Sequence, residues 1–240
     1  MNQKLDILAF AAHPDDVELS CSGTLIKMAK AGKKVGIVDL TQGELGTRGS
    51  AELRMVEAAN SSEIMGLSAR ENLKMADGFF EINNQNKLKV IEQIRRFKPQ
   101  ILIANALNDR HIDHARGARL VADAAFLSGL RKIETQWNGE AQEAWRPKVV
   151  LHYIQDRFMT PSFIVDISEE WNTKVDSIKA FSSQFYDPNS NEPKTPISGE
   201  DFFDFLRGRA KEMGRLIGAE FGEGFVCERP IGINDLTLLA

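Results

Sequence analysis

The sequence predicts an α/β protein with a Rossmann-like, three-layer αβα fold, in which helices cover both faces of a mostly parallel sheet. Two observations carry this prediction. Short apolar runs typical of buried strands alternate with amphipathic stretches of helical length through residues 5–154. Several of the helical stretches also end at a glycine or before a proline, the residues that most often stop a helix.

Leu5–Ala12 (LDILAFAA) has the apolar character of a buried strand, and Val17–Ala31 then has helical spacing and ends before Gly32. Val35–Leu40 is the second strand. Ala51–Met65 is the second helix, and a glycine again follows it.

A weaker strand pattern at Glu71–Met75 precedes the helix Asn84–Phe97, which stops before a proline. Ile101–Ala106 (ILIANA) is another buried strand, Ala115–Ser128 is a helix, and Val149–Ile154 is a further strand. Right-handed crossovers are the default for such an alternation.

The pattern changes after residue 163, and we expect one domain over residues 1–240 with its C-terminal third, about 163–240, packed onto the sheet. Phe163–Ile167 is expected to be an edge strand and Ser168–Phe181 a helix. The polar, proline-rich stretch Tyr186–Gly199 is expected to be a long loop of the functional kind. A helical pattern resumes at Glu200–Ile217.

Composition and charge exclude several function classes. The 30 lysines and arginines against 34 aspartates and glutamates give a net charge of −4 without a basic stripe, so we expect no nucleic-acid partner. No apolar run reaches the roughly 18 residues of a membrane span, and we expect no membrane association. Two cysteines and a start without signal-peptide character indicate the cytoplasm.

The first chemical motif is His13-Pro14-Asp15-Asp16-Val17-Glu18, which directly follows the first strand and opens the first helix. Ligands of open α/β sheets bind beyond the carboxyl ends of the strands, where this motif lies. A plain helix cap would explain one aspartate, but it would not explain a histidine and two adjacent carboxylates that leave the sheet together.

The second motif, Asp109-Arg110-His111-Ile112-Asp113-His114, follows the strand Ile101–Ala106 and therefore lies at the same edge of the sheet. A solvated polar loop is the alternative interpretation. Imidazole and carboxylate ligands together suit zinc, with iron or cobalt as alternatives. Because the cysteines lack metal-ligand spacing, an open site with three protein ligands and one water is favoured over a closed structural site.

The loop Thr41–Ser50 follows the second strand and has glycines spaced G-x-x-G-x-x-G, which does not match a dinucleotide- or phosphate-binding loop. Arg48 in this loop and Arg54 one turn into the next helix could hold an anionic or sugar substrate. For Arg48 taken alone, a surface arginine is the favoured interpretation. Tyr186 could reach the substrate from the long loop, and His152 is expected in the core.

These motifs together resemble the PIG-L/LmbE-like family of zinc-dependent N-deacetylases. The resemblance covers most of the chain, and its segments are H-P-D-D-x-E at 13–18, T-Q-G-E-L-G-T-R-G at 41–49, E-N-L at 71–73, D-G-F at 77–79, D-R-H-x-D-H at 109–114 and the stretch 207–225. The loop at 41–49 and the D-G-F segment look most like the bacillithiol-biosynthesis branch, which deacetylates N-acetylglucosaminyl malate. Ser20, Ser22 and Ile112 depart from the family pattern at positions that carry no ligand.

The resemblance implies that His13, Asp16 and His114 bind Zn²⁺ and that Asp15 is the general base. It implies that His111, oriented by Asp113, stabilises the oxyanion in protonated form or protonates the leaving amine. It also implies that Arg54 binds substrate. The residues alone could not separate Asp15 from Asp16.

The resemblance further implies a small N-acetylglucosaminyl glycoside as substrate and a homo-oligomeric assembly. The alternatives are a deacetylase for an inositol or chitooligosaccharide aglycone, and a catalytically silent sugar- or metal-binding protein.

Overall fold

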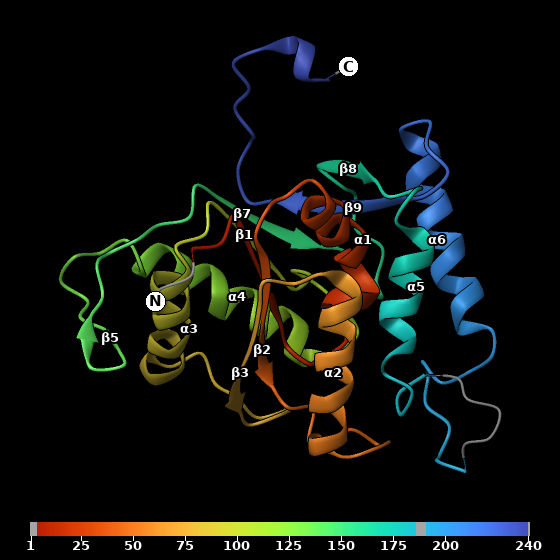
Figure 1. Ribbon diagram of the computed structural model, residues 1–240, viewed down its shortest axis with the longest axis horizontal. Coiled ribbons are helices and arrows are strands. Elements are labelled where there is room, and N and C mark those ends of the chain that lie inside the picture. The colour runs from red at the N-terminus through yellow and green to blue at the C-terminus, as the bar shows by residue number, and fades with distance from the viewer. Residues whose placement is uncertain (1–3, 186–190, 240) are drawn as a thin grey trace.

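A seven-stranded sheet lies at the centre of the computed structural model, which describes residues 4–185 and 191–239 (Figure 1). Its strands are β1 (Ile7–Ala11), β2 (Val35–Thr41), β3 (Ala69–Met75), β4 (Ile101–Ala104), β7 (Val149–Tyr153), β8 (Phe163–Asp166) and β9 (Gly222–Cys227). They lie in the order β3-β2-β1-β4-β7-β9-β8, and β9 runs antiparallel to both of its neighbours. The predicted mostly parallel sheet, with 163–167 at its edge, is confirmed.

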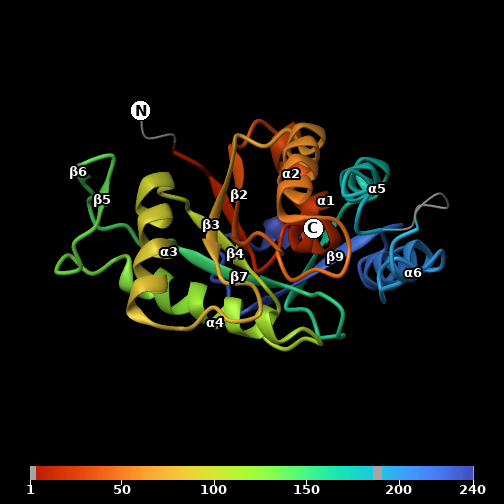
Figure 2. The same ribbon diagram turned by 90° about the horizontal axis from the view of Figure 1, so that it is seen from below.

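Helices cover both faces of this sheet, as the sequence predicted (Figure 2). They are α1 (Asp16–Lys30), α2 (Ala51–Met65), α3 (Asn84–Phe97), α4 (Ile112–Leu127), α5 (Trp171–Lys179) and α6 (Phe202–Leu216), with a short 3₁₀ helix at Leu236–Leu239. Leu8 and Phe10 of β1 pack against α3 and α4. Ile7 and Ala9 point the other way, toward α1, because successive strand residues alternate between the two faces.

Strand β1 lies between β2 and β4. After β1 the chain adds β2 and β3 on one side of it, and then crosses over to add β4 on the other side. Ile7 pairs with Val35 on one side and with Ile101 on the other, all in parallel. The carboxyl ends of β1 and β4 therefore meet where the strand order reverses, which is the place where open α/β sheets bind ligands.

The C-terminal elements pack on this core from one side. Helix α5 lies against α1 and α2, and α6 lies against β9. Phe181 and Phe185 join Phe202 and Leu206 in a separate apolar cluster between these helices. Within the described residues, no helix is both long and apolar enough to cross a membrane.

The structure differs from the expected elements in several places, and α5 covers Trp171–Lys179 instead of the expected 168–181. Strand β9 and the hairpin of β5 (Gln136–Trp137) with β6 (Glu140–Ala141) were not predicted, α1 is interrupted at Cys21, and α4 begins three residues early at Ile112. Strand β9 carries two glycines, which weaken a strand signal. The α6 backbone requires one of them, because a Cβ at Gly222 would lie 2.8 Å from the Gly214 nitrogen.

Candidate metal centre and active site

The first motif makes a tight passage from β1 into α1. Asp15 occupies the N-cap position with φ 119° and ψ −22°, a left-handed conformation that aspartate adopts more readily than most residues. The helix begins at Asp16, whose Oδ2 accepts a hydrogen bond from the His13 backbone N–H at 2.9 Å. The turn therefore places the two neighbouring carboxylates and His13 together at the carboxyl end of β1.

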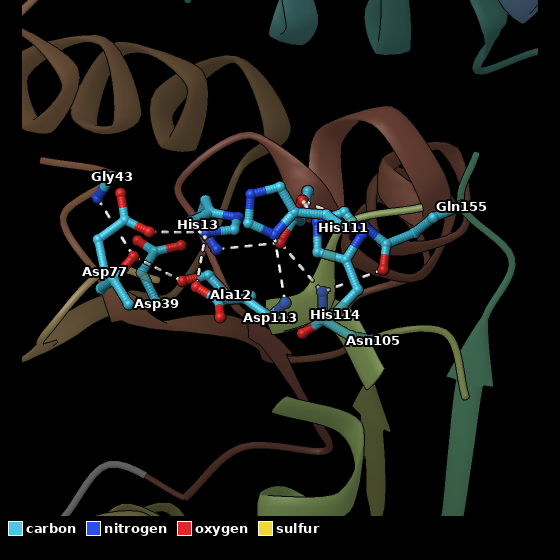
Figure 3. Close-up of polar contacts among 12 residues, drawn as sticks. Ala12, His13, Asp39, Gly43, Asp77, Asn105, His111, Asp113, His114 and Gln155 are labelled. Carbon is cyan, nitrogen blue, oxygen red and sulfur yellow. Dashed lines mark hydrogen bonds and ion pairs between the residues drawn. The ribbon is translucent and has the colours of Figure 1, made fainter. Parts of the chain in front are cut away.

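The second motif brings two more histidines to the same place (Figure 3). His111 caps the N-terminus of α4, where its Nδ1 accepts the Asp113 backbone N–H at 3.2 Å. His114 lies in the first turn of the helix. Each of the three histidines offers a ring nitrogen, and these nitrogens lie within 4.8 Å of one another, as the ligands of one metal ion would.

Asp16 lies between two of these histidines. Its Oδ1 is 3.0 Å from His114 Nε2, and its Oδ2 is 3.6 Å from His13 Nδ1. The other ring nitrogens face second carboxylates: His13 Nε2 is 3.0 Å from Asp77, and His114 Nδ1 bonds to Asp109. Metal-binding histidines commonly use this arrangement, in which an outer carboxylate fixes the ring and its tautomer. The histidines and carboxylates gathered here are therefore a donor set of the kind that binds a metal cation.

Two buried amides hold the Asp16 carboxylate, and sequence reasoning missed both. Asn105 Nδ2 donates to Oδ2 at 3.0 Å, and Gln155 Nε2 donates to Oδ1 at 3.1 Å. Asn105 follows β4 and Gln155 follows β7, so their places after buried strands were the available signal. His152, expected in the core, is fully buried, and its Nδ1 bonds to the Asn105 carbonyl at 2.8 Å.

The site strongly favours positive charge. Burial lowers the pKa of His114, but the charge of Asp16 and hydrogen bonds to two carboxylates outweigh it and raise the pKa to about 9. Burial also opposes charge on His13, yet three surrounding carboxylates hold its pKa well above the usual value. Side chains that stabilise an extra proton here would stabilise a metal cation for the same reason.

Asp15 has a different environment from Asp16. It is almost completely buried, and this burial raises the pKa of its carboxyl to about 7, against the opposing charge of Arg54. The two neighbouring aspartates therefore differ in their chemical properties because their surroundings differ. Asp16 is held by amides and histidines, whereas Asp15 has the raised pKa of a proton acceptor.

His111 and Asp113 differ from the expected pairing. The Asp113 carboxylate accepts the Gly78 N–H at 2.8 Å and an Arg116 bond at 2.7 Å, and it lies 3.4 Å from His13 Nε2. The backbone of Asp113, rather than its carboxylate, therefore orients His111. Burial and the charge of His13 lower the pKa of His111. Because its Nδ1 accepts the Asp113 N–H, the neutral ring carries its proton on Nε2, which can donate.

The candidate substrate residues lie beside this cluster. Arg54 is buried and its guanidinium bonds to Gln184, which in turn donates to the Arg48 carbonyl at 2.8 Å. Arg48 is also buried, so its interpretation as a surface arginine is wrong. Tyr186 lies outside the described residues.

A cavity opens next to Asp16 and His114 and runs along α6. Leu206 and Met213 are among its apolar lining residues, and Arg110 and Arg209 bring positive charge to it. The cavity is therefore partly apolar, and Lys174 also lines it, so three cationic side chains lie along it.

Fold and site together define a class: an α/β protein with a His/Asp metal-binding cluster at the carboxyl ends of its strands. Residues 8–125 match the family described as PIG-L, GlcNAc-PI de-N-acetylase. The uncharacterized deacetylase YaiS of Escherichia coli K12 is 31% identical over 150 residues, which cover 60% of this chain and 78% of YaiS. The diacetylchitobiose deacetylase of Thermococcus kodakarensis is 24% identical over 237 residues, which cover 93% of this chain and 83% of that enzyme. The chain belongs to the PIG-L family.

Solved structures share the whole fold. The conserved protein TT1542 from Thermus thermophilus is 32% identical with a TM-score of 0.85, and the match covers 97% of this chain and 98% of that one. GalB, the 4-carboxy-2-hydroxymuconate hydratase from Pseudomonas putida KT2440, is 18% identical with a TM-score of 0.78, covering 96% and 98%. Since a hydratase has this fold, the fold alone does not set the reaction. The family and its deacetylase members confirm the predicted enzyme class.

Proposed function

We propose that the protein is a zinc-dependent hydrolase that removes the acetyl group from an N-acetylglucosamine-type glycoside. One observation carries this proposal. His13 and His114 each turn one ring nitrogen toward Asp16 and the other toward an outer carboxylate, while the buried Asp15 adjoins Asp16 in sequence and keeps a raised pKa. Relatives named as deacetylases, one of them for diacetylchitobiose, support an N-acetylated sugar as substrate.

In this proposal His13, Asp16 and His114 hold the zinc ion, which when bound supplies a Lewis acid for the amide carbonyl and lowers the pKa of water. Asp15 accepts the proton of the attacking water at its carboxylate. His111 donates a hydrogen bond from Nε2 to the oxygen that becomes negatively charged, and Asp113 holds the ring through its backbone N–H. The proton taken up by Asp15 passes to the amine nitrogen as the C–N bond breaks, and the free amine and acetate are the two products.

We propose N-acetylglucosaminyl malate, of bacillithiol biosynthesis, as the first substrate to test. The net charge of −4 gives no general attraction for a malate-bearing sugar, so local cations must hold it. Arg54 beside the cluster and Arg110 and Arg209 in the cavity are the available groups. Arg48 and Tyr186 remain candidate substrate contacts.

The decisive experiment measures acetate release from N-acetylglucosaminyl malate with and without a chelator. Inositol and chitooligosaccharide glycosides in the same assay test the alternative aglycones. Chelator-sensitive release that is fastest with the malate glycoside is the expected result. Faster release from another glycoside contradicts the malate assignment, and no release from any of them favours a silent binding protein.

We also propose that the protein is cytoplasmic, that residues 1–240 form a single domain, and that the protein assembles as a homo-oligomer. Light scattering coupled to size exclusion measures the assembly, and limited proteolysis tests the single domain. A mass equal to one chain of 26.8 kDa would contradict the oligomer.

A further inference from the structure

Helix α1 is interrupted one turn after the residues proposed to bind the metal. Cys21 has φ −144° and ψ 16°, outside the helical range, so Asp16–Ser20 forms a separate first turn. Such a break leaves carbonyl oxygens at the end of the first segment and N–H groups at the start of the second without helical partners. Groups from outside the helix must therefore satisfy the break.

A buried ion pair satisfies both sides of it. Lys174 of α5 donates from Nζ to the Leu19 carbonyl at 3.0 Å and lies 2.6 Å from Glu223 Oε1. Glu223 of β9 accepts the backbone N–H groups of Gly23 at 3.0 Å and Thr24 at 2.7 Å, and the Thr24 hydroxyl at 2.6 Å. Both charged side chains are at most 4% exposed.

The signs of the two charges match the two helix ends. The cation lies at the C-terminal end of the first segment and the anion at the N-terminal end of the second, as the helix dipole favours. A buried ion pair is costly unless its hydrogen bonds are satisfied, and both Glu223 oxygens accept bonds here. The pair therefore holds a defined geometry at the break.

Two neighbouring contacts show how tightly this geometry is set. A Cβ at Gly23 would lie 2.8 Å from Ile167 Cδ1 and 3.0 Å from Glu223 Oε1, so only glycine allows the close approach. Strand β9 also pairs with β7, and the residue two positions after β7 is Gln155, which donates to Asp16. The elements that fix the break are thus joined to those that hold the Asp16 carboxylate.

We propose that Glu223 and Lys174 are positioning residues, which fix the orientation of the first turn of α1 and thereby aim the Asp16 carboxylate at the metal. The inference rests on the proposed metal site and deepens it. Both side chains also line the cavity beside Asp16 and His114, but their hydrogen bonds go to α1 and to each other, and the proposed role needs no contact with the metal. Their effect reaches the site through the backbone of residues 16–20.

Cobalt binding tests this proposal without relying on catalysis, because Co²⁺ reports its coordination geometry through its visible absorption spectrum. Glu223→Gln keeps the size of the side chain and removes its charge. We expect it to bind Co²⁺ at least tenfold more weakly than the wild type and to change the spectrum. Arg95→Met is the matched control, since Arg95 is fully buried on α3 and bonds to the carbonyls of Ser128, Leu130 and Ile133. We expect it to lower Tm while cobalt affinity stays within twofold.

Affinity and spectrum unchanged within twofold in a folded Glu223→Gln protein would overturn the positioning role. If circular dichroism shows that this variant does not fold, Thr24→Val decides, because it removes a single hydroxyl contact to Glu223. We expect it to weaken cobalt binding about threefold, and an unaltered spectrum and affinity would again overturn the proposal. A wild type that binds no Co²⁺ or Zn²⁺ instead contradicts the proposed function itself.

Discussion

Asp15 is held in a backbone conformation that few residues other than glycine adopt. Its φ of 119° costs of order 1–3 kcal/mol, which the rest of the fold must offset. Strain of this kind concentrates at functional sites, and here it allows two consecutive carboxylates to leave β1 with different surroundings. The raised pKa of Asp15 and the histidine contacts of Asp16 both follow from this turn.

We expect Asp15→Asn to keep the fold and the metal and to lose most activity. Asparagine tolerates the same positive φ and has almost the same shape, but it cannot accept the proton of the attacking water. Loss of a general base typically costs about 10²–10⁴-fold, measured here as kcat for acetate release. Zinc content by elemental analysis should equal that of the wild type. A kcat close to the wild-type value would show that Asp15 is not the base.

Gly43 shows how an element positions a residue far along the chain. It has a φ of 66° in the loop after β2, and an added Cβ there would collide with Arg54 Nη1. The loop backbone therefore lies directly against the guanidinium, which also donates a hydrogen bond to Gln184.

Gly43→Ala should therefore displace Arg54. We expect KM to rise about tenfold or more, since a charge-assisted hydrogen bond contributes about 1.5–3 kcal/mol. Gly32→Ala is the matched control, because Gly32 has a φ of 78° and nothing within 4 Å of an added Cβ. It should cost about 1–2 kcal/mol of stability from the left-handed backbone and leave KM unchanged. Equal KM values for the two variants would contradict the role of Arg54 in substrate binding.

Arg70 links strands β2 and β3 to helix α1 close to the first motif. From β3 it contacts both oxygens of Asp39 on β2, at 2.8 and 3.0 Å, and reaches Glu18 on α1 at 2.6 Å. Burial already raises the pKa of Asp39, although the charge of Arg70 opposes this. Arg70 therefore supplies the positive charge that pairs with both buried carboxylates.

Arg70→Met should lower the free energy of unfolding by about 3–5 kcal/mol, because it leaves two buried carboxylates unpaired. The pKa of Asp39 then rises further above its unfolded value, so the folded state binds more protons than the unfolded state. Stability is consequently lost as the pH rises, and urea unfolding should show a larger deficit at pH 8 than at pH 5. Arg119→Met, at an exposed pair with Asp123, should change stability by less than about 1 kcal/mol. A deficit that does not vary with pH would contradict this explanation.

How far each element could be predicted depended on where its signal lies in the sequence. The parallel strands and their helices carry local apolar periodicity, and the sequence predicted them. Strand β9 carries Gly222 and Gly224, which are required because α6 and Ile154 approach its backbone closely. These contacts are distant in sequence, so the pairing of β9 could not be predicted from its local sequence. Helix α4 begins earlier than expected because His111 serves as its N-cap, a role that histidine seldom has.

At the scale of the whole molecule, the candidate site draws on the carboxyl ends of β1, β3, β4 and β7, which supply His13, Asp77, Asn105 and Gln155. The motifs predicted the parts that follow β1 and β4, because each is a dense run of polar residues directly after a buried strand. Asp77, Asn105 and Gln155 are single polar residues, and only the sheet order shows that they converge on one cluster.

A metal ion bound by residues after both β1 and β4 should stabilise the entire fold, because those residues come together only in the folded chain. Zinc present at 100 times its Kd would add about 2.7 kcal/mol, so excess EDTA should lower Tm by roughly 5–10 °C. His114→Ala should lose zinc and the response to EDTA together. His111→Ala should lose activity but keep that response, since the proposed ligands are His13, Asp16 and His114. The three histidines are close enough together to form a different ligand set. If the His111→Ala protein no longer responds to EDTA, the third ligand is His111 and not Asp16.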